Sequence, residues 1–403
     1  RPEVWRRARR LLMGHDYLAY QLCGEPATDH SMAGGTLLYD LAGQDWSQQL
    51  LDAFDIPREL LPPVHWAGRP LGFVRRAVAD ALGLRADVVV AVGGQDQKCA
   101  ALGAGIADGV AAVSLGTAAA IVQLLERPIT DPLMRIPTFA FVQPQRWVLE
   151  GVIGAAGGSL RWYHDTLAAG AAYSVLDAEA AATPPGSGGV LFYPHLSGAT
   201  SPHWRNQARG TFHGLHLATG RGHLTRAILE GVAYQIRENL EITEEVGRPA
   251  ERVILYGGGA KSALWRQIIG DVLGRPVGWA QTTETATLGA AMLAGVGCGV
   301  FASLEAAHDL SSDGSPLARR ALRLVLARVA QDESGASVRP RRRSCARATA
   351  IRLGPSPPPA RPLRRDLLPR GRAIVRLPRA PSLPAQAPGE RSLSCRSCPR
   401  RRS

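Results

Sequence analysis

Short runs rich in β-branched residues alternate with segments of helical periodicity along most of the chain, and this alternation restricts the folds open to it. The clearest helical segment is 225–242, where Ile228, Val232, Ile236 and Leu240 lie four residues apart on one apolar stripe. Further helices are expected at 11–22 and 46–54, and strands at 87–92, 110–115, 118–124, 147–151, 190–193 and 252–256. This alternation predicts an α/β fold in which helices cover the faces of sheets.

A carboxylate follows the most strand-like of these runs. Residues 87–92 (Asp-Val-Val-Val-Ala-Val) predict a strand buried on both faces, and Gly93-Gly94-Gln95-Asp96-Gln97 comes next. In open α/β sheets, ligands bind at the carboxyl ends of the strands. Asp96 at that edge can act as a general base, because the glycine pair lets a ligand approach. The alternative is an aspartate that bonds its own backbone in a turn.

Two glycine-containing turns have the form of phosphate or nucleotide sites. Ser114-Leu115-Gly116-Thr117 joins two expected strands and offers N–H groups and a hydroxyl to a phosphate, although a plain hairpin turn has the same pattern. Residues 255–262 (Leu-Tyr-Gly-Gly-Gly-Ala-Lys-Ser) pass from a strand into a helix that Ser262 caps and Gly274 ends. Ala260 excludes a Walker A loop, because that motif requires glycine directly before its lysine. Ser262 excludes a dinucleotide fingerprint, because that motif has glycine or alanine at this position.

One loop carries two histidines without the partners that a metal site needs. Residues 193–204 (Tyr-Pro-His-Leu-Ser-Gly-Ala-Thr-Ser-Pro-His-Trp) contain no cysteine or carboxylate at ligand spacing, so we expect an ordered loop beside an active site and no metal site. Near the C-terminus, Cys395-x2-Cys398 has no second cysteine pair and predicts no zinc site.

The net charge of +13 belongs to one end of the chain. Residues 331–403 contain 18 arginines, no lysine and four acidic residues, so the remainder is almost neutral. The basicity is therefore no argument for a nucleic-acid-binding function. The Arg/Pro/Ser/Ala composition predicts disorder from about residue 331. The sequence is aberrant from about residue 308, as a frameshifted end of a gene would be.

The remaining composition favours a cytoplasmic protein. No charged and then apolar leader follows Arg1, and three scattered cysteines (Cys23, Cys99 and Cys298) make no disulfide framework. The uncharged segment 285–304 contains Gly295-x3-Gly299, a pattern found in membrane helices. Its four glycines and many alanines instead favour a helix packed tightly on a sheet.

Taken together, in this order and spacing, these motifs resemble the FGGY family of carbohydrate kinases, its xylulokinases most closely. The motifs stand at 16–18, 22–25, 28–29, 31–33, 46–47, 60–62, 93–97, 114–117, 156–162, 194–204, 208–215, 230–234, 257–267 and 288–291. The resemblance implies an α/β fold of two actin-like (ribonuclease-H-like) domains with a cleft between them. Residues 1–106 would be the C-terminal part of the sugar-binding domain, which is incomplete. Residues 107–307 would form the ATP-binding domain, and 308–403 an aberrant, disordered tail.

The resemblance also implies roles for particular residues. Asp96 would be the catalytic base and Gln97 would lie beside the sugar. The remaining residues would contact ATP: Gly116 and Thr117 its phosphates, Gly157 and Arg161 the nucleotide, and Gly258, Gly259 and Ser262 the adenosine. The implied cofactors are ATP and Mg²⁺, with no protein residue assigned as a metal ligand. The implied partner is a small sugar, with no specific nucleic acid and no membrane, and a homodimer is allowed.

The activity that follows is ATP-dependent phosphorylation of a sugar hydroxyl, with D-xylulose as the expected substrate and D-xylulose 5-phosphate as the product. The alternatives are another ketose or polyol, such as ribulose or glycerol, and a non-catalytic actin-like nucleotide-binding protein. The family begins with a strand that carries an Asp-x-Gly-Thr/Ser phosphate loop, and this sequence contains no such segment. We therefore expect the chain alone to be a fragment with little or no kinase activity.

Overall fold

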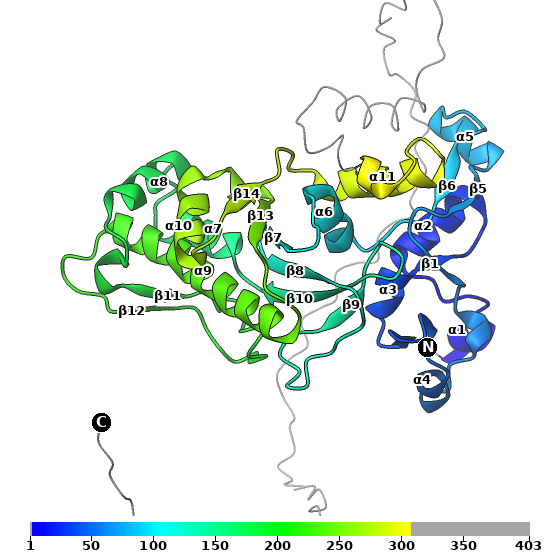
Figure 1. Ribbon diagram of the computed structural model, residues 1–403, viewed down its shortest axis with the longest axis horizontal. Coiled ribbons are helices and arrows are strands. Elements are labelled where there is room, and N and C mark those ends of the chain that lie inside the picture. The colour runs from blue at the N-terminus through cyan, green and yellow to red at the C-terminus, as the bar shows by residue number, and fades with distance from the viewer. Residues whose placement is uncertain (1, 308–403) are drawn as a thin grey trace, which may run out of the picture. The chain divides into compact units, whose positions relative to one another are not determined.

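A six-stranded mixed sheet forms the centre of the protein, whose computed structural model describes residues 2–307 (Figure 1). The strand order is β14-β13-β7-β8-β10-β9. The strands are β7 (Val110–Ser114), β8 (Ala119–Leu125), β9 (Thr138–Ala140), β10 (Trp147–Ile153), β13 (Arg252–Tyr256) and β14 (Val277–Trp279). β14, β13 and β7 run parallel, whereas β7, β8, β10 and β9 are antiparallel neighbours. Tyr256 pairs with Ser114, so β13 and β7 end side by side.

Helices cover both faces of this sheet. α7 (Gly157–Thr166), α8 (Tyr173–Ala182), α9 (Arg221–Val246) and α10 (Ala263–Leu273) belong to one core, and α6 (Asp96–Ala104) and α11 (Thr285–Gly297) to the other. Along β7, Ala111 and Val113 enter the first core and Ala112 enters the second, as the alternation of a strand requires. Figure 1 shows α6 and α11 together above the sheet. The predicted α/β class is therefore confirmed.

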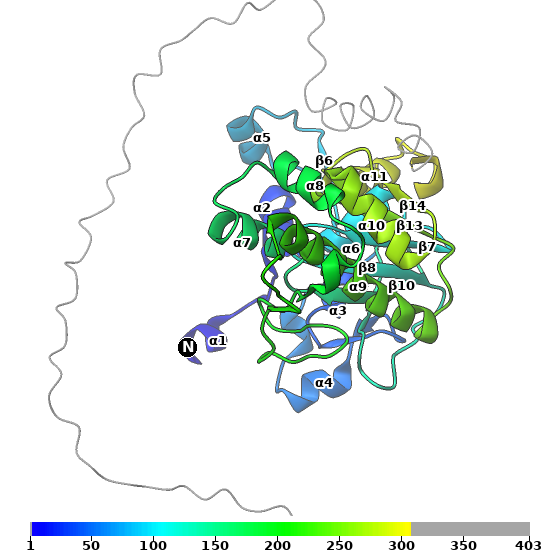
Figure 2. The same ribbon diagram turned by 90° about the vertical axis from the view of Figure 1, so that its left-hand side faces the viewer.

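Short elements make up the first hundred residues. They are α1 (Pro2–Arg7), α2 (Gly14–Cys23), β1 (Thr28–Asp29), α3 (His30–Gly34), β2 (Tyr39–Asp40), β3 (Asp45–Trp46), α4 (Gln48–Ala53), η1 (Arg58–Leu60), β4 (Val64–His65), β5 (Pro70–Phe73), α5 (Arg76–Leu82) and β6 (Val89–Ala91). Tyr39, Trp46 and Leu51 share a third core with Trp147 and Leu149 of β10. In both Figure 1 and Figure 2, α4 lies at the bottom of this part of the chain, on the side away from α11.

The strand predicted at 87–92 is shorter and less buried than expected. β6 covers Val89–Ala91 and pairs, within the described residues, with β5 alone, in an antiparallel ribbon. Its three residues are half-buried. The prediction of a strand buried on both faces was wrong, because burial depends on neighbouring strands and helices that the local sequence does not specify.

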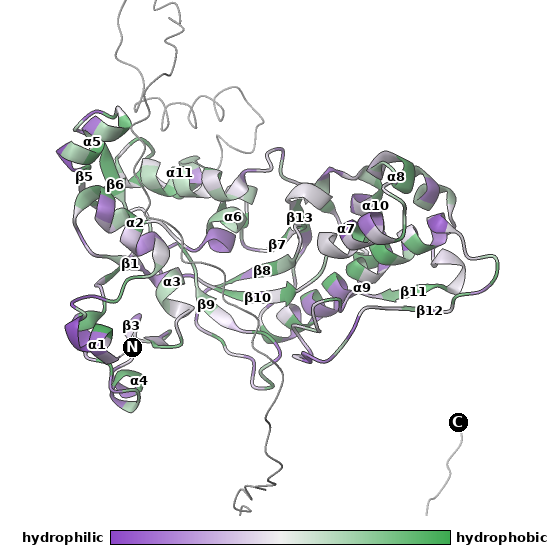
Figure 3. Cartoon of the chain, turned by 180° about the vertical axis from the view of Figure 1, so that it is seen from behind, coloured by the Kyte–Doolittle hydropathy of each residue, from purple (hydrophilic) through white to green (hydrophobic). Residues whose placement is uncertain are grey.

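A second two-stranded ribbon extends from the helical side of the sheet. It consists of β11 (Leu191–Tyr193) and β12 (Thr211–His213), and two further 3₁₀ turns are η2 (Ser187–Gly189) and η3 (Gly258–Lys261). The hydropathy colouring of Figure 3 shows that the central strands β8 and β10 are mainly apolar. Every residue of β8 is buried. By contrast, the hydrophilic helix α1 buries no residue.

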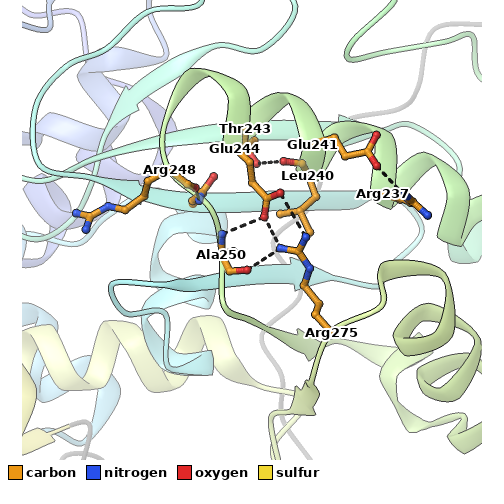
Figure 4. Close-up of polar contacts among 9 residues, drawn as sticks. Arg237, Leu240, Glu241, Thr243, Glu244, Arg248, Ala250 and Arg275 are labelled. Atoms are coloured by element: carbon orange, nitrogen blue, oxygen red, sulfur yellow. Dashed lines mark hydrogen bonds and ion pairs between the residues drawn. The ribbon is translucent and has the colours of Figure 1, made fainter. Parts of the chain in front are cut away.

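The end of α9 is joined to β13 and β14 by one arginine (Figure 4). The guanidinium of Arg275 donates to the carboxylate of Glu244 on α9 and, at 2.6 Å, to the carbonyl oxygen of Ala250. The Ala250 N–H in turn donates to Glu244 Oε1 at 2.9 Å. Both backbone groups of Ala250 are thus satisfied just before β13 begins, which fixes the strand that leads to the 257–262 loop.

The segment 285–304 forms α11 and a following turn. Across residues 2–307, none of the helices combines the length and the apolar character that a membrane crossing requires. The predicted disorder and aberrant origin of residues 308–403 concern residues outside the described part of the chain.

Candidate functional site

Asp96 lies exposed at the first position of α6. Gln95 caps this helix, because its side-chain oxygen accepts from the Lys98 N–H at 3.1 Å. Asp96 Oδ1 accepts from Gln95 Nε2 at 2.8 Å and from the Gln97 N–H at 2.7 Å. These local bonds orient the carboxylate and leave Oδ2 outside them.

Of the two glycines before Gln95, Gly94 is packed closely against neighbouring side chains, whereas a methyl group on Gly93 would have nothing within 4 Å. A methyl group on Gly94 would lie 2.5 Å from Val142 Cγ1 and 3.1 Å from Cys99 Sγ, so no larger residue fits without movement. The next N–H, that of Gln95, donates to Ser31 Oγ at 2.9 Å, and the Ser31 hydroxyl donates to buried Asp29. Burial raises the pKa of Asp29, while its bonds from Ser31 oppose that shift. The loop that presents Asp96 is therefore held by the start of α3.

Gln97 combines partial burial with an unused acceptor. Its Oε1 atom is buried, and no group among the described residues hydrogen-bonds to it. Buried polar atoms rarely lack a partner, so this oxygen is an exception among the described residues.

A buried ion pair lies directly after these residues. Lys98 is 3% exposed and pairs with Glu150 of β10, and its ammonium lies 4.1 Å from the centre of the Phe139 ring. Tyr256, at the end of β13, is also buried, and its pKa is raised by burial, by Glu150 and, to a smaller degree, by Asp96. The sequence pattern did not predict this cluster.

The Gly116–Thr117 turn packs against the beginning of α7. The N–H of Gly157 donates to the Gly116 carbonyl, and that of Gly158 to the Thr117 carbonyl, both at 2.9 Å. A methyl group on Gly157 would lie 2.5 Å from the Gly116 oxygen, so glycine is required for this approach. Gly116 and Thr117 are exposed, and Arg161 is exposed one turn further along α7. The structure therefore brings these four predicted residues together.

The second glycine turn lies against the first. The Leu115 N–H donates to the Tyr256 carbonyl, and the Gly259 N–H donates to the Leu115 carbonyl, both at 2.8 Å. Gly257 has a φ of +89°, and a methyl group there would meet the Leu115 carbonyl oxygen at 3.0 Å. Gly258, in contrast, is exposed and faces open space. Leu115 thus sets the spacing between the two turns.

The Ser262 hydroxyl has a structural role, because it both accepts and donates a hydrogen bond within the fold. It caps α10 by accepting from the Trp265 N–H at 3.1 Å, and it donates to Asp177 Oδ2 of α8 at 2.8 Å. The predicted helix from Ser262 to Leu273 and its stop at Gly274 are confirmed, with Gly274 in the left-handed conformation. Asp177 was not predicted, because a contact across 85 residues leaves no local pattern.

The loop at 193–204 is fastened to the sheet and to α9. Thr200 donates to the Val152 carbonyl, and Ser201 Oγ lies 2.7 Å from Asn239 Oδ1. His203 Nε2 lies 3.0 Å from Glu238 Oε1, and burial lowers the pKa of His195.

Residues 2–307 contain no group of three or more His, Cys, Asp or Glu side chains that could hold a metal ion.

The two glycine turns and the start of α7 lie together where the parallel strands β7 and β13 end, and α10 begins after the second turn. The chain belongs to the FGGY family of carbohydrate kinases: the model of the N-terminal domain matches residues 1–103 and that of the C-terminal domain residues 111–298.

Individual relatives are kinases of different sugars and sugar acids. The xylulose kinase of Lactococcus lactis is 36% identical over 307 residues, which are 76% of this chain and 61% of that protein. The gluconokinase of Bacillus subtilis is 30% identical over 77% of this chain and 63% of its own. The crystal structure of xylulose kinase from Rhodospirillum rubrum superposes with a TM-score of 0.70 at 29% identity, covering 81% of this chain and 68% of that one. This chain therefore spans about three fifths of the length of the curated relatives.

Proposed function

We propose that this protein binds ATP and takes part in phosphoryl transfer from ATP to a sugar hydroxyl, with D-xylulose as the substrate, in the cytoplasm. In this proposal residues 1–106 contribute to the sugar side and residues 107–307 to the nucleotide side. The observation that carries it is the position of Asp96, exposed at the start of α6, together with the contact between the Gly116–Thr117 turn and the 257–262 loop through Leu115.

The nucleotide would lie along the two glycine turns. Gly116 and Thr117 present exposed backbone and hydroxyl groups beside the N-terminus of α7, where Gly157 begins a ten-residue helix. The first N–H groups of α7 already donate to the Gly116 and Thr117 carbonyls, so the phosphates would be favoured here by the positive end of the helix dipole and by the Thr117 hydroxyl. Arg161 adds a cation one turn away. The open space at Gly258, beside Gly259 and Ser262, then receives the adenosine.

In the proposed reaction Asp96 Oδ2 takes the proton of the sugar hydroxyl. The hydroxyl oxygen attacks the γ-phosphorus of ATP, the bond to the β-phosphate oxygen breaks, and ADP leaves. Gln97, half-buried directly after Asp96, would lie beside the sugar and orient it. ATP would arrive with Mg²⁺ on its own phosphates, and no protein ligand is assigned to that ion.

The support for D-xylulose is the xylulose kinases at 36% and 32% identity. Because a gluconokinase is 30% identical to this chain, gluconate and other sugars are compared with D-xylulose as substrates. The sequence contains no Asp-x-Gly-Thr loop, so we further propose that the 403-residue chain turns sugar over slowly or not at all by itself.

Two measurements test this function. Calorimetric titration of the full chain should show ATP binding, which Asp96→Asn leaves within about twofold, because Asp96 acts on the sugar. Sugar-dependent ADP release is then measured with a chimera in which the unmatched parts of the Lactococcus lactis enzyme are joined to residues 1–307. We expect D-xylulose to be preferred over gluconate, ribulose and glycerol, and Asp96→Asn to lower kcat by about 10²- to 10⁴-fold.

Asp52→Asn on α4 is the matched control, because Asp52 is an exposed acid that contacts Gln48. It should leave turnover unchanged. Normal kcat in Asp96→Asn would remove Asp96 from the role of base, and a chain that binds no ATP would refute the nucleotide site.

A further inference from the structure

Asp177 stands out near the 257–262 loop as a carboxylate without a cation. It lies half-buried on α8, and none of the ion pairs within residues 2–307 includes it. Its neighbour on the same helix, Glu179, is in contrast paired with Arg221. A half-buried carboxylate is costly to desolvate unless its oxygens are hydrogen-bonded, so the partners of Asp177 need to be accounted for.

One of its two oxygens has a partner and the other does not. Asp177 Oδ2 accepts from Ser262 Oγ at 2.8 Å, and this is the one hydrogen bond of Asp177 among the described residues. The same Ser262 oxygen accepts from the Trp265 N–H. The hydroxyl of Ser262 therefore uses its only proton in the hydrogen bond to Asp177 and cannot also donate to a ligand. The free acceptor at this point is Asp177 Oδ1.

One nearby cation, Arg266, is engaged elsewhere. Arg266 donates to the carbonyl oxygens of Ala260 and Lys261, at 2.6 and 3.2 Å, and its guanidinium lies 4.1 Å from the centre of the Trp279 ring. Arg266 thus holds the 257–262 loop in shape from the side of β14, and Asp177 holds its end from the side of α8. Within the same loop, Gly258 faces open space.

Charge determines which end of a nucleotide can approach Asp177. A carboxylate repels the triphosphate, which the N-terminus of α7 and Arg161 attract. The nucleoside end is neutral, and its ribose carries two hydroxyl donors. In dinucleotide-binding folds of another kind, an acidic side chain accepts a hydrogen bond from a ribose hydroxyl.

We propose that Asp177 recognises the ribose of the bound nucleotide, with Oδ1 accepting a hydrogen bond from the 2′- or 3′-hydroxyl while Ser262 fixes the carboxylate through Oδ2. Asp177 is then a specificity-determining residue that makes the site select ribonucleotides over deoxyribonucleotides. This inference rests on the proposed function, because it presupposes that the 257–262 loop borders the nucleoside.

The test is calorimetric titration of the full 403-residue chain with ATP, 2′-deoxy-ATP and 3′-deoxy-ATP, which needs no kinase activity. We expect the wild-type chain to bind ATP about tenfold more tightly than at least one deoxy analogue. Asp177→Asn should weaken ATP binding by about tenfold and reduce the preference to within about twofold, because an amide oxygen is a weaker acceptor than a carboxylate.

Two further variants separate recognition from structure. Ser262→Ala removes the tether and should weaken all three nucleotides while the preference for ATP is retained. Asp271→Asn, an exposed acid on α10 that contacts Gln267, should change nothing. Thermal unfolding midpoints of all variants are recorded, so that a loss of binding through unfolding is recognised and Asp177→Ser then replaces Asp177→Asn.

The outcomes are distinguishable. ATP binding with a ribose preference that Asp177→Asn leaves intact overturns the role of Asp177 and leaves the proposed function standing. Equal loss for all three nucleotides in Asp177→Asn assigns Asp177 to loop structure or to the base, and also overturns it. A wild-type chain that binds none of the nucleotides overturns this inference together with the proposed nucleotide site.

Discussion

Asp96 and Lys98 are two residues apart and have opposite environments. Asp96 is exposed at the first position of α6, whereas Lys98 is almost fully buried against Glu150. A helix turns by about 100° per residue, so two positions suffice to carry a side chain from solvent into the core. The exposed position could be predicted from the glycine pair and the strand before it. The partner of Lys98 could not, because Glu150 is 52 residues away.

His30 provides a pH-dependent contribution to stability. Its Nδ1 lies 2.6 Å from the Tyr39 hydroxyl oxygen, and its ring lies 3.8 Å from that of Trp66, centre to centre. Burial lowers the pKa of His30 from 6.5 to about 4. Between these values the unfolded chain binds a proton that the folded protein excludes, so stability falls as the pH falls from 6.5 to 4.

The expected loss from this residue is at most about 3 kcal/mol. We predict that His30→Gln flattens the dependence of the free energy of unfolding on pH between 4 and 6.5. Urea denaturation of the wild type and the variant at several pH values measures it. A difference between the two proteins that stays constant across this range would contradict the assignment.

Among the elements, α6 is tied to the sheet by the Lys98–Glu150 pair. Removing one member leaves the other charge buried alone, which costs about 3–5 kcal/mol, whereas replacing both with apolar residues is often nearly neutral. We predict that Lys98→Met lowers the free energy of unfolding by this amount and that Lys98→Met with Glu150→Leu recovers most of it. Urea denaturation of the three proteins measures the effect.

The exposed pair Arg76–Asp80 on α5 supplies the control. Arg76→Met should cost less than about 1 kcal/mol, because solvent screens surface pairs. A cost for Lys98→Met as small as that of the control would show that the buried pair does not stabilise the fold.

The elements that could be predicted are those with local signals at both ends. The strand expected at 252–256 coincides with β13, and the Ser262 cap and Gly274 stop bound α10 as expected. The burial of β6 was not predictable in the same way, because it depends on strands paired through tertiary contacts. Asp177 belongs to this second group, since α8 meets Ser262 only in the folded protein.

At the scale of the whole molecule, charge is segregated along the chain. The 18 arginines of residues 331–403 account for the net charge of +13, and the rest is nearly neutral. We predict that the full chain is retained on heparin and released by salt, as expected of non-specific polyanion binding, whereas residues 1–330 pass through. Retention of residues 1–330 at the same salt concentration would instead locate a basic surface within the folded part.

Family membership and the α/β class could be predicted from the motifs, because glycine turns and caps impose the same backbone wherever they occur. The identity of the sugar could not. It depends on side chains from separate elements that surround one small molecule, and no local spacing encodes their convergence.

The packing of α6 on α11 has a consequence for the order of events during synthesis. Gly103 and Gly289 let the backbones touch, since a methyl group on either would overlap a carbonyl oxygen of the other helix. Roughly 180 residues separate the two helices. At ribosomal rates of about 5–20 residues per second, α6 waits roughly 10–40 s for its partner. During that interval the face of α6 that α11 covers in the folded protein lacks this partner.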